Sequence, residues 1–269
     1  MKPKMIDIHS HILPFTDDGA DDWECSIAML RNGEAEGIKT IVATPHILGE
    51  NFFKEENMII KTYHELCKKA KAEKLQIKIL LGCEIYAQPD TSLDHKIATL
   101  NSNDKYFLIE FPMNSIPQFV PEKLFEFVVD EKIPIIAHPE RNIGFQNRPD
   151  FIYEYVQRGS LMQINQGSLF GRFGKRAKTL AFKMLENNLV HFIASDGHKK
   201  DTRMVTLIDS YELVFHEFGK QIADTLFRDN PLKAIQGEKI EIDEPIPIEK
   251  EEKLGFWGRL KKIRNRVKD

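Results

Sequence analysis

The chain has 269 residues, of which 42% are hydrophobic, and carries a formal charge of −3 at pH 7. It is long enough to bury one large core without dividing into two domains, and its mildly acidic balance gives no general field that would attract nucleic acid. No apolar run reaches the roughly 18 residues of a membrane span, and residues 1–15 lack the pattern of a signal peptide. We therefore expect a cytoplasmic protein.

Short β-branched runs alternate with amphipathic stretches along most of the chain, a pattern typical of βα units and a parallel sheet. We predict seven strands, at residues 5–9, 40–44, 77–83, 106–111, 134–137, 161–164 and 191–194. Helical patterns lie between or after them, at residues 22–36, 54–73, 121–131, 175–187 and 205–227. The sequence therefore predicts one α/β domain over residues 1–236.

Side chains that can bind a metal ion follow or end every predicted strand except the sixth, which is followed by Asn165 and Gln166. In a parallel barrel the carboxyl ends of the strands meet at one end of the molecule, where active sites form. Each side chain alone is compatible with a surface group, but together they would form a costly charged cluster without cations. In chain order they are His9, His11, Asp17 or Asp18, His46, Glu84, Glu110, His138, Asp196 and His198. No role is predicted for His64, His95, His191 and His216.

With these residues, the chain resembles the PHP superfamily and, within it, the bacterial protein-tyrosine phosphatases of capsular and exopolysaccharide gene clusters, from about residue 5 to residue 232. Six motifs carry the resemblance: Asp7-Ile8-His9-Ser10-His11-Ile12-Leu13-Pro14, Asp17-Asp18-Gly19, Ala43-Thr44-Pro45-His46, Ala137-His138-Pro139-Glu140-Arg141, Gln163-Ile164-Asn165-Gln166-Gly167-Ser168-Leu169 and Ile193-Ala194-Ser195-Asp196-Gly197-His198.

The resemblance implies a distorted seven-unit (β/α) barrel of the PHP type that binds three divalent metal ions, commonly manganese. It also implies that Arg141 and Arg203 hold the phosphate. Asp18 is the expected ligand of its tandem, although Asp17 could replace it. The implied ligand set is His9, His11, Asp18, His46, Glu84, Glu110, His138, Asp196 and His198.

Imidazole and carboxylate ligands suit Mn²⁺, Fe²⁺ or Zn²⁺. Three such ions against four carboxylates leave a formal excess of two positive charges, which a phosphate dianion would complement. We expect a metal-bound hydroxide to attack phosphorus, two arginines to stabilise the phosphoryl oxygens, and His198 or Asp196 to assist as an acid. The tyrosine leaving group, with a pKa near 10, needs little protonation.

The predicted function is therefore metal-dependent hydrolysis of phosphotyrosine, with a bacterial tyrosine kinase that regulates capsule or exopolysaccharide synthesis as the expected substrate. Two alternatives remain at this point. One is a small-molecule phosphomonoesterase similar to histidinol phosphatase, and the other is a non-catalytic PHP module that binds metal.

Cysteine-based phosphatase chemistry finds little support. Cys25 and Arg31 have the Cys-x5-Arg spacing of cysteine-dependent tyrosine phosphatases, but the five residues between them form an apolar helical stretch without the glycines of a phosphate-binding loop. The cysteines are odd in number and in no metal-type spacing, which favours a reducing compartment: Cys25, Cys67 and Cys83.

Residues 171–176, Gly-Arg-Phe-Gly-Lys-Arg, precede a predicted helix. They either contact an anionic substrate through the N-terminus of that helix or form a flexible loop with solvated basic groups.

The composition changes after residue 236. Residues 237–252 form an acidic linker that contains proline, and residues 253–269 have apolar side chains at helical spacing among seven basic residues. This tail either lies on an anionic membrane surface or docks on the barrel as a terminal helix.

Overall fold

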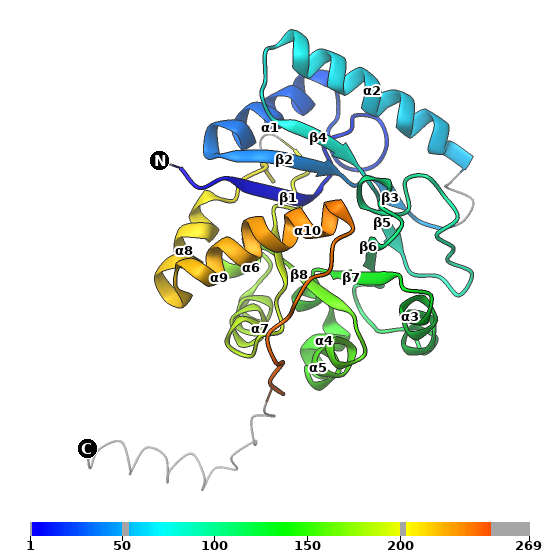
Figure 1. Ribbon diagram of the computed structural model, residues 1–269, viewed down its shortest axis with the longest axis vertical. Helices are drawn as coiled ribbons and strands as arrows, with labels where there is room; N and C mark the ends of the chain where they lie inside the picture. The colour runs from blue at the N-terminus through cyan, green and yellow to red at the C-terminus, as the bar shows by residue number, and fades with distance from the viewer. Residues whose placement is uncertain (1, 50–53, 200–202, 249–269) are drawn as a thin grey trace, which may run out of the picture.

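The structure, a computed structural model, describes residues 2–49, 54–199 and 203–248. Within them, parallel strands form two sheets, of order β1-β2-β4 and β3-β5-β6-β7-β8-β9. The chain after β9 returns to β1, where the Asp196 N–H donates to His9 O at 2.9 Å. Helices lie around the strands (Figure 1), and this arrangement confirms the predicted barrel-like α/β fold. The strands are β1 Met5–Ser10, β2 Ile38–Ala43, β3 His46–Ile47, β4 Lys78–Leu81, β5 Glu84–Tyr86, β6 Tyr106–Glu110, β7 Ile133–Ala137, β8 Leu161–Asn165 and β9 Phe192–Ala194.

The second and third βα units each contain a second short strand that the sequence did not predict. We expected His46 and Glu84 in the loops beyond their strands, but His46 begins β3 and Glu84 begins β5. The two residues are direct partners in the parallel pairing of β3 with β5. This register fixes an imidazole beside a carboxylate at the carboxyl end of the barrel.

The predicted helices form with small changes in their bounds. Helix α1, Trp23–Glu36, begins after Asp22, whose side chain accepts from the Cys25 N–H, and is followed by Gly37 with φ 108°. A Cβ at Gly37 would lie 2.6 Å from Pro3 O, so this turn requires glycine. The other helices predicted with one continuous span are α2 Glu56–Ala72, α3 Val120–Val129 and α7 Lys175–Glu186.

The helix predicted at residues 205–227 is wrong as a single element. Gly219, with φ 90°, separates α8 from α9, which continues into a π-helical turn. A left-handed φ interrupts the helical hydrogen bonds, and glycine adopts it without steric cost. The resulting pieces are α8 Ile208–Phe218, α9 Lys220–Asp224 and η4 Thr225–Asp229; the short helices not predicted include α4 Ile143–Asn147, α5 Asp150–Gln157, α6 Gln166–Leu169 and α10 Asn230–Gln236.

Two hydrophobic clusters hold the strands. The larger one packs the strands against the surrounding helices, and the smaller one joins strand residues such as Ile8 and Leu108 to Ala234 and Ile235 of α10. Helix α10 crosses beside β1 (Figure 1), and its last carbonyls accept from the Asn101 and Asn103 side chains. Burial of these side chains contributes about 25 cal/mol of stability per Å² of apolar surface. It holds in place the strands that carry the polar side chains at their carboxyl ends.

After α10 the described chain continues to residue 248 without helix or strand. It remains packed on the barrel, because the Tyr106 hydroxyl donates to Glu238 O at 2.6 Å and Ile248 is buried. The predicted basic tail, residues 253–269, lies outside the described residues. Among the described helices, none is long and apolar enough to cross a membrane.

Candidate metal centre

The structure brings all nine predicted ligand side chains to the carboxyl end of the strands, from segments spread between the first strand and the loop after the last. Their ligand atoms form overlapping groups in which every atom lies within 4.8 Å of the others. Four groups are present: His11, Asp18, His46 and His198; His9, His11 and Asp196; His9, Glu84 and His138; and His46, Glu84 and Glu110.

Glu84 is the centre of this cluster. Its Oε2 lies 3.1 Å from His9 Nε2, 3.3 Å from His11 Nε2 and 3.2 Å from His46 Nδ1. Its other oxygen, Oε1, lies 2.9 Å from His138 Nε2. A single buried carboxylate therefore contacts four imidazoles from three segments of the chain, as expected of a ligand shared between neighbouring cations.

Two of the candidate ligands lie on strained backbone directly beyond their strands. His138 follows β7 with φ 35°, and Asp196 lies just past β9 with φ 50°. Non-glycine residues rarely adopt a left-handed conformation, and each instance costs of order 1 kcal/mol or more. The surrounding structure sustains this cost at the two positions where the chain turns a ligand side chain toward the cluster.

The structure assigns different positions to the two residues of the Asp17-Asp18 tandem. Asp18 Oδ1 lies 3.4 Å from His198 Nε2, at the exposed mouth of the cluster. Asp17 instead is buried behind His11, with Oδ2 2.7 Å from His11 Nδ1 and accepting from the His46 N–H. Asp18 thus has the position of a ligand, whereas Asp17 orients the imidazole of one.

Strand β8 contributes no candidate ligand, but its amides position two of them. Gln163 Oε1 lies 2.8 Å from His9 Nδ1 and can accept its proton, which leaves Nε2 directed at Glu84. Gln163 Nε2 donates to Asn165 Oδ1 at 2.9 Å, and Asn165 Nδ2 donates to Asp196 Oδ2. This chain of amides fixes the ring of one candidate ligand and the carboxylate of another, as outer partners do in metal sites.

The protonation of the cluster shows how strongly its groups are coupled. Burial alone would lower the pKa of His11, but the Asp17 carboxylate raises it to about 9. Likewise, the neighbouring carboxylates of Glu110 and Glu84 overcome burial and raise the pKa of His46 to about 9. For Glu84 itself, burial opposes ionisation, but the neighbouring imidazoles hold the pKa well below its usual range. Protons on these imidazoles thus balance carboxylates that divalent cations would otherwise neutralise.

The side chains of the cluster fit divalent metal ions. Three buried ligand atoms have no hydrogen-bond partner: Glu84 Oε2, Asp196 Oδ1 and His46 Nδ1. Leaving such atoms unpaired is costly, and each of the three faces other ligand atoms of the cluster. A set of imidazoles and carboxylates suits Mn²⁺, Fe²⁺ or Zn²⁺.

Both predicted phosphate-binding arginines reach the edge of the cluster. Arg141 Nη1 donates to Asp196 Oδ2 at 2.9 Å, and Arg203 Nη2 forms an ion pair with the same oxygen. Asp196 therefore presents Oδ2 to two guanidinium groups and Oδ1 to the imidazoles of His9 and His11, each at 3.5 Å.

The sequence interpretation gave no role to Gln163 or Glu140, although both lie inside the quoted motifs. Glu140 is completely buried and accepts from the Asn165 N–H and the Ser168 hydroxyl, so it ties β8 and α6 to the segment that carries Arg141. Burial raises the pKa of this carboxyl group. Alternation of polar and apolar residues in β8 was the available signal for Gln163.

Comparison with known proteins identifies the family of the chain. Residues 5–236 match the family described as "Capsular polysaccharide synthesis, CpsB/CapC". The chain is 36% identical to the tyrosine-protein phosphatase YwqE of Bacillus subtilis over 94% of this chain and 100% of that protein. It is 35% identical to the tyrosine-protein phosphatase CpsB of Streptococcus agalactiae, over 84% and 96% of the two chains.

Two solved structures are similar to this chain. A chain from the study of B. subtilis YwqE and Streptococcus pneumoniae CpsB, described as unique metal-dependent tyrosine phosphatases, matches with a TM-score of 0.85 and 35% identity over 91% of this chain and all of that one. The phosphotriesterase homology protein of Escherichia coli shares the fold alone, with a TM-score of 0.53 and 11% identity over 87% of this chain and 99% of that one. As its motifs predicted, the chain belongs to the CpsB/CapC family of capsular polysaccharide synthesis.

Proposed function

We propose that this protein is a metal-dependent protein-tyrosine phosphatase. The observation that carries the proposal is the convergence of nine ligand-type side chains and two arginines at one end of the barrel, with Asp196 between the two sets. Relatives that cover almost the whole chain are named tyrosine-protein phosphatases, which supports the same activity here.

The nine candidate ligands are sufficient for three divalent ions with about three protein ligands each, and manganese is the metal we propose first. When bound, such ions would supply a Lewis acid and would lower the pKa of a coordinated water from 15.7 to about 7. Glu84 would be the shared ligand, since it contacts His9, His11 and His46 through one oxygen. Gln163 and Asp17 would hold the rings of His9 and His11 in the required orientation.

Arg141 and Arg203 are the proposed phosphate ligands. Each guanidinium is only partly buried, with side-chain exposures of 17% and 21%, and each is held by Asp196 at the border of the cluster. A planar guanidinium can bind two phosphoryl oxygens at once, and its charge stabilises the charge that spreads over them during transfer. The departing tyrosine has a pKa near 10, so little proton donation is needed. His198 or Asp196 is proposed to assist as the acid.

The proposed substrate is a phosphotyrosine protein, with an autophosphorylated bacterial tyrosine kinase of polysaccharide synthesis as the first candidate. The family match to capsular polysaccharide synthesis supports this choice. We propose a cytoplasmic location, which three free cysteines suit.

Hydrolysis of a phosphotyrosine peptide and of histidinol phosphate, each with added Mn²⁺ and after thorough chelation, tests the proposal. We expect faster turnover of the peptide and loss of both activities on chelation, with recovery when Mn²⁺ returns. Faster turnover of histidinol phosphate would overturn the substrate class, and activity that survives chelation would overturn the metal-dependent mechanism.

A further inference from the structure

An aromatic side chain outside the ligand set contacts both proposed phosphate-binding arginines. The Cζ atom of Arg141 lies 4.2 Å from the ring centroid of Phe173, and that of Arg203 lies 5.6 Å from the same centroid. Phe173 belongs to the loop between α6 and α7, whereas the two arginines follow β7 and β9. One ring therefore contacts two cationic side chains that lie far apart in the chain.

The two guanidinium groups share a single counterion oxygen. Both contact Asp196 Oδ2, so their like charges lie close together while each side chain remains partly exposed. A free arginine side chain loses rotamer entropy when the group is held for a ligand. The face of an aromatic ring attracts a cation within about 6 Å of its centroid, and both guanidinium groups meet this limit at Phe173.

The loop that carries Phe173 is held in place by its own backbone. The Arg172 N–H donates to Gly167 O, and the Gly171 N–H donates to Ser168 O, both at 3.0 Å. A Cβ at Gly167 would lie 3.2 Å from Phe173 Cε2, so glycine there leaves room for the ring. These contacts tie the loop to α6 and place the ring of Phe173 beside the two arginines; both alternatives for residues 171–176 remain predictions.

We propose that Phe173 is a positioning residue for phosphate recognition, which holds Arg141 and Arg203 in the orientation that receives the phosphoryl group. This inference rests on the proposed phosphatase function and adds a residue to its phosphate site. Phe173 acts through the arginines, so its removal weakens binding of the phosphate group itself, whether or not an aromatic ring is attached.

The test compares Phe173→Leu and Phe173→Met, which remove the ring, with Phe173→Tyr, which keeps it, in the Mn²⁺-loaded full chain. The first probe is inorganic phosphate, whose Kd is measured by calorimetry, and the second is the KM and kcat for a phosphotyrosine peptide. We expect the ringless variants to raise the phosphate Kd and the peptide KM by a similar factor of about three to ten, and Phe173→Tyr to restore values near the wild type.

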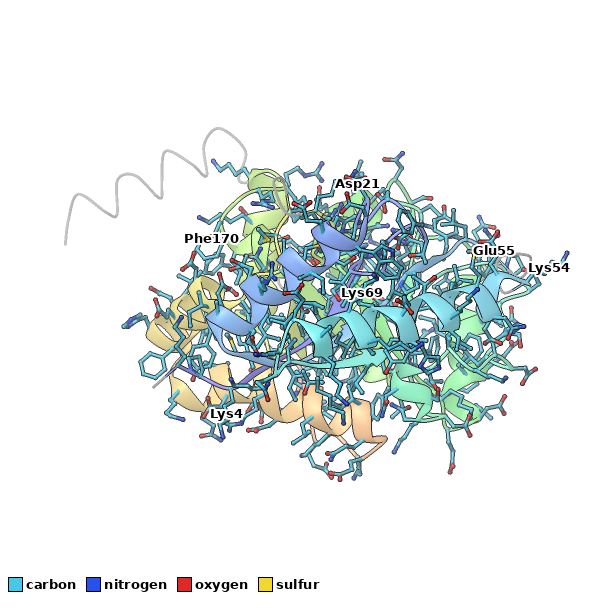
Figure 2. The ribbon with its side chains drawn as sticks, turned by 90° about the horizontal axis from the view of Figure 1, so that it is seen from above. Lys4, Asp21, Lys54, Glu55, Lys69 and Phe170 are labelled. Atoms are coloured by element: carbon cyan, nitrogen blue, oxygen red, sulfur yellow. The ribbon has the colours of Figure 1, made fainter. Side chains whose placement is uncertain are left out.

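The matched control is Phe170→Leu, three positions earlier in the same region. Phe170 is 50% exposed on the outside of the molecule (Figure 2), and we expect its variant to bind phosphate as the wild type does. Thermal unfolding and metal content separate a local effect from misfolding, and the methionine variant keeps an apolar side chain if leucine destabilises the loop.

Three outcomes would overturn the inference. An unchanged phosphate Kd with a raised peptide KM would mean that Phe173 contacts the substrate ring, not the arginines. Unchanged values for both probes, or equal losses in Phe170→Leu, would remove the positioning role. A wild type that binds phosphate without hydrolysing the peptide would contradict the proposed function alone, because the phosphate comparison would still decide the role of Phe173.

Discussion

Buried histidines occur at both ends of the barrel, and His11 and His191 lie in opposite electrostatic settings, although burial and the charge of His11 also lower the pKa of His198, at the carboxyl end, to about 3. At the carboxyl end, His11 is 1% exposed, and the Asp17 carboxylate beside it raises its pKa to about 9. At the amino end, His191 precedes β9, is 3% exposed, and has its pKa lowered to about 3 because burial there is not compensated by a carboxylate. Without a bound cation, the same residue type thus favours its protonated form in one setting and its neutral form in the other.

The two histidines differ because a carboxylate lies beside His11, whereas only burial acts on His191. His191 Nδ1 accepts from the Met162 N–H at 3.0 Å, so a neutral imidazole satisfies a strand amide. The other ring nitrogen of His191, Nε2, is buried without a partner, as Glu84 Oε2 and His46 Nδ1 are, but only around Glu84 do several imidazoles and carboxylates lie within 3.5 Å of one another. Burial without a carboxylate is therefore typical of a structural histidine, whereas burial of several imidazoles among carboxylates indicates a site for cations.

The largest effect is expected from Glu84→Gln, which removes the charge from the centre of the cluster without changing its size. Because Glu84 contacts four imidazoles, the variant should lose bound metal and at least about 100-fold in kcat, more than the 10- to 100-fold loss typical of outer partners. Metal analysis of the purified protein and turnover of a phosphotyrosine peptide measure the two effects together.

Glu140→Gln is the matched control for this prediction. Glu140 is equally buried and lies near the same cluster, but its oxygen accepts from Asn165 and Ser168 and it belongs to none of the candidate ligand groups. We expect this variant to retain its metal. If Glu84→Gln also retained full metal and activity, the contrast between the two ends of the barrel would not reflect metal binding.

At the opposite end, His191→Gln should alter the pH dependence of stability. In the unfolded chain the imidazole titrates near 6.5, whereas in the fold burial lowers its pKa to about 3. Below pH 6.5 the unfolded state therefore binds a proton that the folded state does not, and stability falls as the pH decreases toward 3. At pH 5 the loss from this group is about 2 kcal/mol, and the glutamine variant, which does not titrate, should lack it.

Urea unfolding at pH 7 and pH 5 measures this difference in the wild type and the variant. His216→Gln, which replaces an exposed histidine on α8, is the control and should keep the wild-type dependence on pH. An equal loss of stability on acidification in His191→Gln and the wild type would show that another group accounts for acid sensitivity at this end.

Much of the architecture was predictable from the sequence, because strand periodicity and the rule that parallel strands end together depend only on local pattern. Those two facts are sufficient to bring His9, Glu110 and His138 to one end of the barrel. The short strands that begin at His46 and Glu84 were not predictable, since a strand of two or three residues has no measurable periodicity.

Other features depend on contacts between distant segments, which no local pattern encodes. The tandem of Asp17 and Asp18 could be resolved only by the position of the His11 ring. The sequence shows Gln163 only as an uncharged residue of a strand, and its role depends on the contact with His9 Nδ1. Phe173 is similar, because its role depends on two arginines that follow other strands.

The smallest effect is expected from Cys25→Ser, which tests whether the Cys-x5-Arg spacing has any catalytic meaning. Cys25 lies in the first turn of α1, is 3% exposed and directs its Sγ toward Met29 Sδ, so the thiol faces the core. Arg31 lies on the same helix, exposed and paired with Glu73, so the two side chains form no phosphate-binding loop. Turnover of the phosphotyrosine peptide should therefore stay within about twofold of the wild type, since substitution away from the reacting groups leaves the transition state unchanged. A Cys25→Ser protein that is folded and retains its metal but is inactive would contradict this prediction. It would indicate that the Cys25 thiol, and not the cluster at the carboxyl end of the barrel, performs the reaction.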